Sequence, residues 1–309
     1  MTNPVLVEVV RSEFVESVHR GSLVVTGPDG GIQLALGDVT SAFFPRSSTK
    51  PLQAVGMLKS GLDFNGEELA LVCASHSGEP GHVKRVQAML AAAGRTEDDL
   101  VCPPAFPLNE TSMRAAAEKR RVTMNCSGKH AGMIATCVAA GWPVPGYARP
   151  DHPLQQVLGS VITELTGDSI EHTGVDGCGA PLFAYSLAGL ARAFGKVARA
   201  ADGPERRVAE AMRAHPWLVA GTGREDTDLM NAVGGLIAKG GAEGVQALAL
   251  PDGTAIAIKI DDGAKRACAP LAVTALEHLG VDVSGLGELA RGQVLGGGEP
   301  VGELRVTGL

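Results

Sequence analysis

The sequence predicts an α+β protein in which both ends of the chain build one antiparallel sheet with flanking helices. Short apolar runs rich in β-branched residues lie near the two termini, whereas helical patterns fill the segment between them. Glycine-rich turns join neighbouring strand patterns, as in antiparallel hairpins. We therefore expect a discontinuous sheet domain at residues 1–45 and 237–309, and an inserted, mainly helical domain at residues 46–236.

The N-terminal strand patterns predict a meander that leads into the first helix. The expected strands are residues 5–10, 14–18, 21–26 and 32–36. The turn at residues 27–31 reads Gly-Pro-Asp-Gly-Gly, and glycine adopts the left-handed conformations that tight hairpins need. The last two strands are therefore expected to form a hairpin.

Helical periodicity dominates the central segment, and strand patterns return after Lys239. The expected helices are residues 51–59, 67–73, 81–93, 110–119, 127–140, 153–166, 180–194, 204–215 and 227–236. Asn109 or Thr111 is expected to cap one helix, and Asp151 another. The elements expected near the C-terminus are strands 245–250 and 254–260, a helix 264–279 and a last strand 303–307.

The composition argues against several classes of protein. The 309 residues are 45% hydrophobic and 20% charged, as in ordinary globular chains. A net charge of −7 without a long basic run argues against a nucleic-acid partner. No apolar run has membrane-spanning length and no signal-like segment opens the sequence, so we expect a cytoplasmic protein with no membrane partner. Six cysteines are too few for a disulfide scaffold and indicate reduced thiols or a metal site.

The first chemical pattern lies where the meander meets the first helix. Ser47 and Lys50 are three residues apart, so a helix that begins here places a hydroxyl and an amine on one face. A serine beside a neutral amine is a nucleophile with its own base, and burial favours the neutral amine. The alternative is an ordinary helix N-terminus with a serine cap and a solvated lysine.

Two further polar motifs follow in order along the chain. Ser75 and Ser77 close an apolar helical pattern, and Lys239 precedes two glycines and a strand pattern. Each also fits a plain structural role, as a capping loop or a helix-to-strand turn. The ordered series S-x-x-K, S-x-S and K-G-G parallels the S-x-x-K, S-D-N and K-T-G series of serine β-lactamases. We therefore expect a site at the junction of the two domains, with Ser75 as a proton relay.

Two cysteines lie in separate glycine turns. Cys126 belongs to the segment 125–130, Asn-Cys-Ser-Gly-Lys-His, and Cys178 follows Asp-Gly. Thiolates bind zinc, and Lys129 is a candidate third ligand if the metal displaces its proton. Because the spacing matches no zinc finger, a Cys126 nucleophile with His130 as base, or two buried thiols, remain alternatives. Buried free thiols are expected for Cys73, Cys102, Cys137 and Cys268.

Side by side, these motifs resemble the rhizobial-type (class 3) L-asparaginases. The segments that carry the resemblance are 46–51, 74–77, 125–130, 176–178, 215–216, 219–221 and 239–242. The resemblance covers most of the chain and implies the fold of serine β-lactamases and β-lactamase-like glutaminases. It also implies hydrolysis of L-asparagine, the expected small-molecule partner, to L-aspartate and ammonia. We further expect a homodimer.

The resemblance assigns roles to particular residues. It implies that Ser47 pairs with Lys50, and that Ser75 pairs with Lys239. The residues that match the family's zinc ligands are Cys126, Lys129 and Cys178. The single zinc ion is implied to tune substrate affinity and not to perform the chemistry. One departure is Asp226, which stands near the position where a member of the family carries a cysteine. A second is a C-terminus that looks shorter than in the family, which we expect to affect how subunits assemble.

For the reaction we expect Ser47 to attack the amide carbon, Lys50 to take its proton, and Ser75 with Lys239 to pass that proton to the leaving ammonia. Backbone N–H groups of Ser47 and the 239–241 turn are expected to hold the oxyanion.

The substrate's charged groups need partners of opposite sign. Candidates for its α-carboxylate are Arg46, Lys129 or the zinc ion. For its α-ammonium, Asp176 is the first choice and Glu79 the second. His130 is a further candidate for substrate binding.

Three other functions remain open at this stage. A glutaminase uses the same chemistry on a substrate one methylene longer, a difference worth only about 1–3 kcal/mol in a pocket. A penicillin-recognising enzyme shares the S-x-x-K logic. A non-catalytic zinc-binding or amino-acid-binding protein would keep the two cysteines. Asparaginases with a threonine nucleophile are excluded, because Thr222 lies far from the chain start and from any expected first strand.

Overall fold

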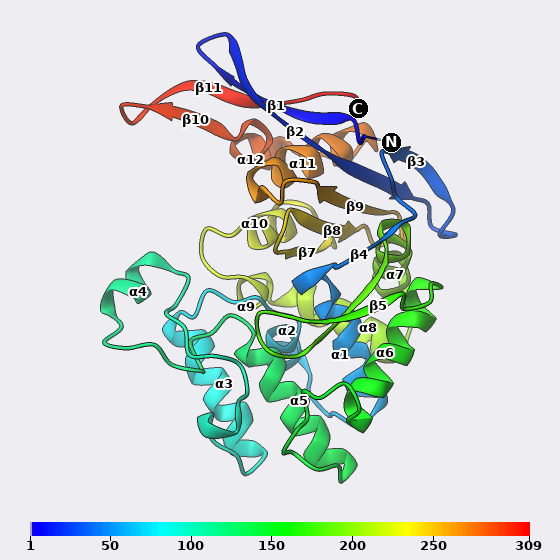
Figure 1. The fold of residues 1–309 in the computed structure, drawn as a ribbon, viewed down its shortest axis with the longest axis vertical. Helices are drawn as coiled ribbons and strands as arrows, with labels where there is room; N and C mark the ends of the chain where they lie inside the picture. The colour runs from blue at the N-terminus through cyan, green and yellow to red at the C-terminus, as the bar shows by residue number, and fades with distance from the viewer. Residues whose placement is uncertain (1) are drawn as a thin grey trace.

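The two ends of the chain meet in one antiparallel sheet of eight strands, which confirms the predicted fold class. The computed structural model describes residues 2–309, so Met1, the first residue of the expected sheet domain, lies outside the described part. The strands of this sheet are β1 (Val5–Arg11), β2 (Phe14–Thr26), β3 (Ile32–Leu36), β7 (Ile237–Gly241), β8 (Val245–Ala249), β9 (Ala255–Ile260), β10 (Gln293–Gly296) and β11 (Glu299–Val306). Their order is β10-β11-β1-β2-β9-β8-β7, and β3 pairs with β2 (Figure 1).

Strand β2 replaces the two strands expected at residues 14–18 and 21–26. Its first half pairs with β1, and its second half pairs with both β3 and β9. Gly21 stands where these halves meet, and a Cβ there would lie 2.2 Å from the backbone oxygen of Lys259. The glycine therefore permits a close approach of β9 instead of ending the strand.

The central segment is mainly helical, as predicted. Its helices are α1 (Lys50–Lys59), α2 (Gly66–Val72), α3 (Pro80–Ala92), α4 (Glu110–Ala115), α5 (Ser127–Ala140), α6 (Pro153–Thr166), α7 (Leu187–Arg199), α8 (Gly203–Ala214), α9 (Pro216–Val219) and α10 (Glu225–Ala232). Helices α5 and α6 have the predicted bounds, and each ends at a glycine with left-handed backbone, Gly141 and Gly167. Figure 1 shows most of these helices beyond the β7 edge of the sheet, whereas α7 and α10 lie beside its strands.

The helix expected at residues 180–194 is wrong. Residues of β6 (Pro181–Ser186) are all buried and form a strand, and α7 begins only after Ser186, whose hydroxyl accepts a hydrogen bond from the Gly189 N–H. A fully buried apolar run carries no periodicity that separates strand from helix. The small second sheet has the order β4-β6-β5, with β4 (Ala42–Phe43) and β5 (His172–Val175).

Helices pack on the large sheet from both parts of the chain. Helix α7, from the central segment, and α11 (Cys268–His278) both contact β8 and β9. The remaining short elements are α12 (Gly287–Arg291) and the 3₁₀ turns η1 (Arg46–Thr49), η2 (Glu97–Asp99), η3 (Lys265–Ala267) and η4 (Ser284–Leu286). The domain boundaries remain a prediction. Within residues 2–309, every helix is too short or too polar to cross a membrane.

Candidate active site

The turn η1, which carries Ser47, lies against strand β7, which carries Lys239. A Cβ on Gly241 would be 2.5 Å from the Pro45 oxygen, so only glycine lets the two backbones come this close. Lys239 was expected in a turn before a strand, but it lies inside β7 because Ile237–Gly241 pairs with β8. The expected junction between the N-terminal segment and the returning strand is therefore present.

Lys50 is buried and its Nζ contacts three acceptors. It donates to the backbone oxygen of Ala74 at 2.6 Å, to Ser75 Oγ at 2.9 Å and to Cys126 Sγ at 3.1 Å. No hydrogen bond joins Lys50 to Ser47 within residues 2–309, so the expected Ser47–Lys50 pair is replaced by a Lys50–Ser75 pair. The reason is that Nζ extends from the start of α1 toward the loop after α2, where these acceptors converge.

Ser47 differs from Lys50, Ser75 and Lys239 in its accessibility. Its side chain is half-buried, whereas those of the other three are buried. In the described part of the chain its hydroxyl makes no hydrogen bond, so it is available to a ligand. The preceding residue, Arg46, has a left-handed backbone with φ of 54°, which is strained for a side chain of this kind. Such strain clusters at functional sites.

Lys239 pairs with Asp226 and not with Ser75. Its Nζ donates to Asp226 Oδ2 at 3.1 Å and to the Gly240 oxygen at 2.8 Å, and both side chains are buried. Burial lowers the pKa of Lys239 to about 8, although Asp226 opposes this change and Lys50 adds to it. Burial acts to raise the pKa of Asp226, but the Lys239 ammonium and the Gly240 N–H hold it below its usual range.

The two residues proposed for the substrate's charges bind each other. Arg46 Nε donates to Asp176 Oδ1 at 2.8 Å, and Arg46 Nη1 lies 3.8 Å from Glu243 Oε1. A pocket of about 370 Å³ is lined in part by Arg46 and Glu243. Glu79, the second choice for the α-ammonium, accepts hydrogen bonds from the backbone and side chain of Thr222 at 2.9 and 2.8 Å.

The loop at residues 219–223 packs over the Ser75 loop. Ser75 N–H donates to the Val219 oxygen at 3.0 Å, and Ser77 Oγ donates to the Ala220 oxygen at 2.7 Å. A Cβ on Gly221 would be 2.0 Å from Ser77 Oγ. This contact explains why a glycine stands in the segment that carries part of the family resemblance.

The three residues that match zinc ligands are brought together. Lys129 Nζ donates to Cys178 Sγ at 3.1 Å, and Cys126 Sγ donates to Asn125 Oδ1 at 3.0 Å. The neighbouring Cys126 and the Lys129 ammonium lower the pKa of Cys178, whereas the proximity of Cys178 and burial raise the pKa of Cys126. The two sulfurs are donors that zinc prefers, whereas Lys129 must first lose a proton that Cys178 and Cys126 favour, since both raise its pKa against the effect of burial. Residues 2–309 contain no group of three or more His, Cys, Asp or Glu side chains placed to hold a metal.

His130 is oriented by Tyr147 and not by Cys126. Tyr147 Oη accepts from the Val101 N–H at 3.1 Å and is hydrogen-bonded to His130 Nδ1 at 2.7 Å. The other ring nitrogen, Nε2, is buried and has no hydrogen-bond partner within residues 2–309. Burial lowers the pKa of His130, which keeps the ring neutral. A Cys126 nucleophile with His130 as base is therefore not supported by the geometry.

All six cysteines are free and buried. This confirms the expectation of buried thiols for Cys73, Cys102, Cys137 and Cys268. Burial raises the pKa of Cys73 to about 12, so this thiol is protonated at neutral pH.

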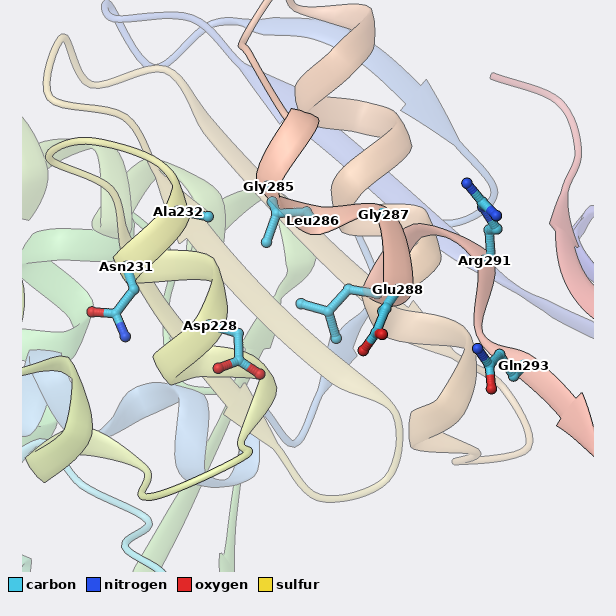
Figure 2. Close-up of a pocket in the computed structure, with 10 residues that line it drawn as sticks. Asp228, Asn231, Ala232, Gly285, Leu286, Gly287, Glu288, Arg291 and Gln293 are labelled. Atoms are coloured by element: carbon cyan, nitrogen blue, oxygen red, sulfur yellow. The ribbon is translucent and has the colours of Figure 1, made fainter. Parts of the chain in front are cut away.

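Two contacts in the site were missed by sequence reasoning. Gln246 Nε2 donates to Asp226 Oδ1 at 3.0 Å, and Tyr147 fixes the His130 ring. The available signal for Gln246 is a lone amide in the otherwise apolar strand β8. A pocket of about 890 Å³ between α10 and residues 285–293 contains none of the expected site residues; Asp228 and Arg291 line it (Figure 2).

Three solved structures resemble the chain over most of its length. The chain is similar to a solved β-lactamase from Mycobacterium bovis, with 16% identity, a TM-score of 0.48 and coverage of 84% of this chain and 94% of that chain. It is similar to EstCE1, a hydrolase with promiscuous acyltransferase activity, at 13% identity, a TM-score of 0.41 and coverage of 78% and 88%. For a Bacillus glutaminase these values are 13%, 0.36, 85% and 92%.

A search of curated proteins gave no match. The family model of L-asparaginase II matches residues 7–306, nearly the whole chain. The chain therefore belongs to the L-asparaginase II family and is an amidohydrolase of the asparaginase type.

Proposed function

We propose that the protein hydrolyses L-asparagine to L-aspartate and ammonia through a serine acyl-enzyme. The observation that carries the proposal is the buried Lys50–Ser75 hydrogen bond of 2.9 Å beside the half-buried, unpaired hydroxyl of Ser47. An amine and a hydroxyl held together without a histidine supply the base and relay that acyl transfer needs.

Ser47 attacks the side-chain amide carbon because it is the accessible serine. Lys50 takes the Ser47 proton in its neutral form, after giving up one of the three protons that it donates in the structure. Ser75, which is hydrogen-bonded to Lys50, and Lys239 then relay the proton to the leaving ammonia. Backbone N–H groups of Ser47 and of the 239–241 segment stabilise the oxyanion. Water then attacks the ester and gives one proton to the neutral Lys50, which returns that proton to Ser47 as L-aspartate leaves.

The Arg46–Asp176 ion pair supports an amino-acid substrate. The side chain of Arg46 is 25% exposed and that of Asp176 is 10% exposed, so the pair lies at the rim of the buried cluster. An α-amino acid carries one positive and one negative charge. When it binds, the Arg46–Asp176 ion pair is replaced by two ion pairs between protein and substrate. Arg46 then binds the α-carboxylate and Asp176 binds the α-ammonium.

We also propose one zinc ion that tunes substrate affinity, held by Cys126, Cys178 and Lys129. When bound, zinc supplies a positive charge that keeps sulfur ligands as thiolates. Cys126 contacts Lys50, which links the proposed metal site to the reacting groups. Elemental analysis of the purified protein tests this proposal. About one zinc per chain is expected, with loss in Cys178→Ser; a zinc-free protein with full activity contradicts it.

A homodimer and a cytoplasmic location are further proposals. The family resemblance supports the first. The six free, buried cysteines support the second, because reduced thiols persist in the cytosol.

The proposal is tested by ammonia release from L-asparagine and L-glutamine. We expect kcat/KM to be about 10- to 200-fold higher for asparagine, the range that one methylene supplies. A preference for glutamine contradicts the substrate, and nitrocefin hydrolysis would indicate a penicillin-recognising enzyme. Asparagine binding without ammonia release would indicate a non-catalytic protein.

A further inference from the structure

A buried carboxylate lies directly beside Lys239. Asp226, near the start of α10, accepts the Lys239 ammonium at 3.1 Å. It also accepts the Gly240 N–H on both oxygens, at 2.8 and 2.9 Å, and Gln246 Nε2 at 3.0 Å. Both oxygens are therefore fixed by the backbone of β7 and a side chain of β8.

This arrangement is costly if its only role is to hold the fold together. A buried ion pair gives up the hydration of both charges, and apolar residues of similar size often stabilise a fold as well or better. Asp226 and Lys239 are each nearly inaccessible, at 2% and 1% exposed. The retention of two opposite charges at strand β7, which lies against the turn that carries Ser47, therefore points to a role in the chemistry.

The surroundings of Lys239 explain what the carboxylate adds. The other titratable groups that act on it are Lys50 from α1, Lys265 from η3 and the Cys73 thiol after α2. Two of these are cations, and cations disfavour a further ammonium. Burial acts in the same direction. Asp226 is therefore the negatively charged partner that favours the protonated form of Lys239 against burial and these two cations.

We infer that Asp226 is a positioning residue that fixes the Lys239 amine at the site and keeps it protonated as the donor to the leaving group. This inference rests on the proposed amide hydrolysis. Lys239 Nζ–H gives its proton to the amide nitrogen as the C–N bond breaks, and ammonia leaves. The proton that Lys50 took from Ser47 replaces it by way of Ser75 once Lys239 comes within reach of Ser75, since in the structure Lys239 Nζ contacts Asp226 and the Gly240 oxygen.

The test is the pH profile of kcat/KM for L-asparagine in Asp226→Asn. Without the carboxylate the charged form of Lys239 is disfavoured, so it loses its proton at lower pH. The alkaline limb should therefore move down by at least about one pH unit, the effect of an opposite charge at this distance. Asp228→Asn is the matched control, since Asp228 lies on the same helix but lines the separate pocket (Figure 2). The alkaline limb of the pH profile of this control variant should stay in place.

A second measurement does not need turnover. In protein labelled with ¹³C-lysine, the Lys239 signal, assigned with Lys239→Arg, should titrate at lower pH in Asp226→Asn than in the wild type. An unchanged midpoint in a folded Asp226→Asn variant overturns the inference. An equal shift in Asp228→Asn also overturns it. If the wild type releases no ammonia but the NMR shift occurs, the proposed function fails and the positioning role of Asp226 stands.

Discussion

Replacing Lys239 by methionine should change how stability depends on pH. Methionine fills a similar volume but cannot ionise. The pKa of Lys239 is lowered from 10.5 to about 8, chiefly by burial. Between these values the unfolded chain binds more protons at residue 239 than the folded chain does. The free energy of unfolding of the wild type therefore rises with pH in this window, and the variant lacks that rise.

The size of the effect follows from the two pKa values. Integration of the linkage relation between about pH 7.5 and about pH 10 gives roughly 2 kcal/mol for this one group. Asp226 keeps its hydrogen bonds from Gly240 and Gln246 in the variant, so the carboxylate is not left without partners. Titrations of groups that do not interact with Lys239 are shared by both proteins and cancel in the difference.

Urea unfolding of both proteins at the two pH values measures this difference. The stability of the wild type relative to Lys239→Met should increase by roughly 2 kcal/mol at the higher pH. Lys84→Met, at an exposed position of α3, is the control and should show no such increase. If the difference in stability is constant with pH, the pKa of Lys239 is not lowered in the folded state, and the reasoning is refuted.

Three further predictions follow from the site. Ser47→Ala should reduce ammonia release by at least about 10³-fold without lowering Tm; near-normal turnover would disprove the nucleophile assignment. Asp176→Asn should raise KM for L-asparagine about 10- to 100-fold with little change in kcat, because a charge-assisted contact is lost; steady-state kinetics in which kcat alone falls would argue against substrate binding there. Gly241→Ala should destabilise the fold by about 1–3 kcal/mol, because its Cβ would meet the Pro45 oxygen at 2.5 Å, and an unchanged urea midpoint would contradict this.

Local patterns predicted most of the elements but few of the contacts. Helices α5 and α6 were predicted with their bounds because each joins a clear helical pattern to a terminal glycine, Gly141 or Gly167. The run that contains β6 was misread because every residue of Pro181–Ser186 is buried, which removes periodicity.

The expected residues do gather, but their partners differ from those that spacing suggested. Lys50 contacts Ser75 and Cys126, which lie 25 and 76 positions away in the sequence. Spacing can pair residues only along one helix, so it favoured the near neighbour Ser47. The partner of Lys239 was visible in the sequence only as a departure from the family pattern, Asp226.

The closure of the sheet has a consequence for synthesis of the chain. Strand β1 pairs with β11, and Val7 lies opposite Val306. On the ribosome, β1 and β2 therefore emerge long before their neighbours β11 and β9 exist, and their open edges need protection from other chains. Lys239 also joins the site only when the last quarter of the chain is made. The nascent chain thus carries Ser47, Lys50 and Ser75 before strand β7 places Lys239 against the turn that holds Ser47.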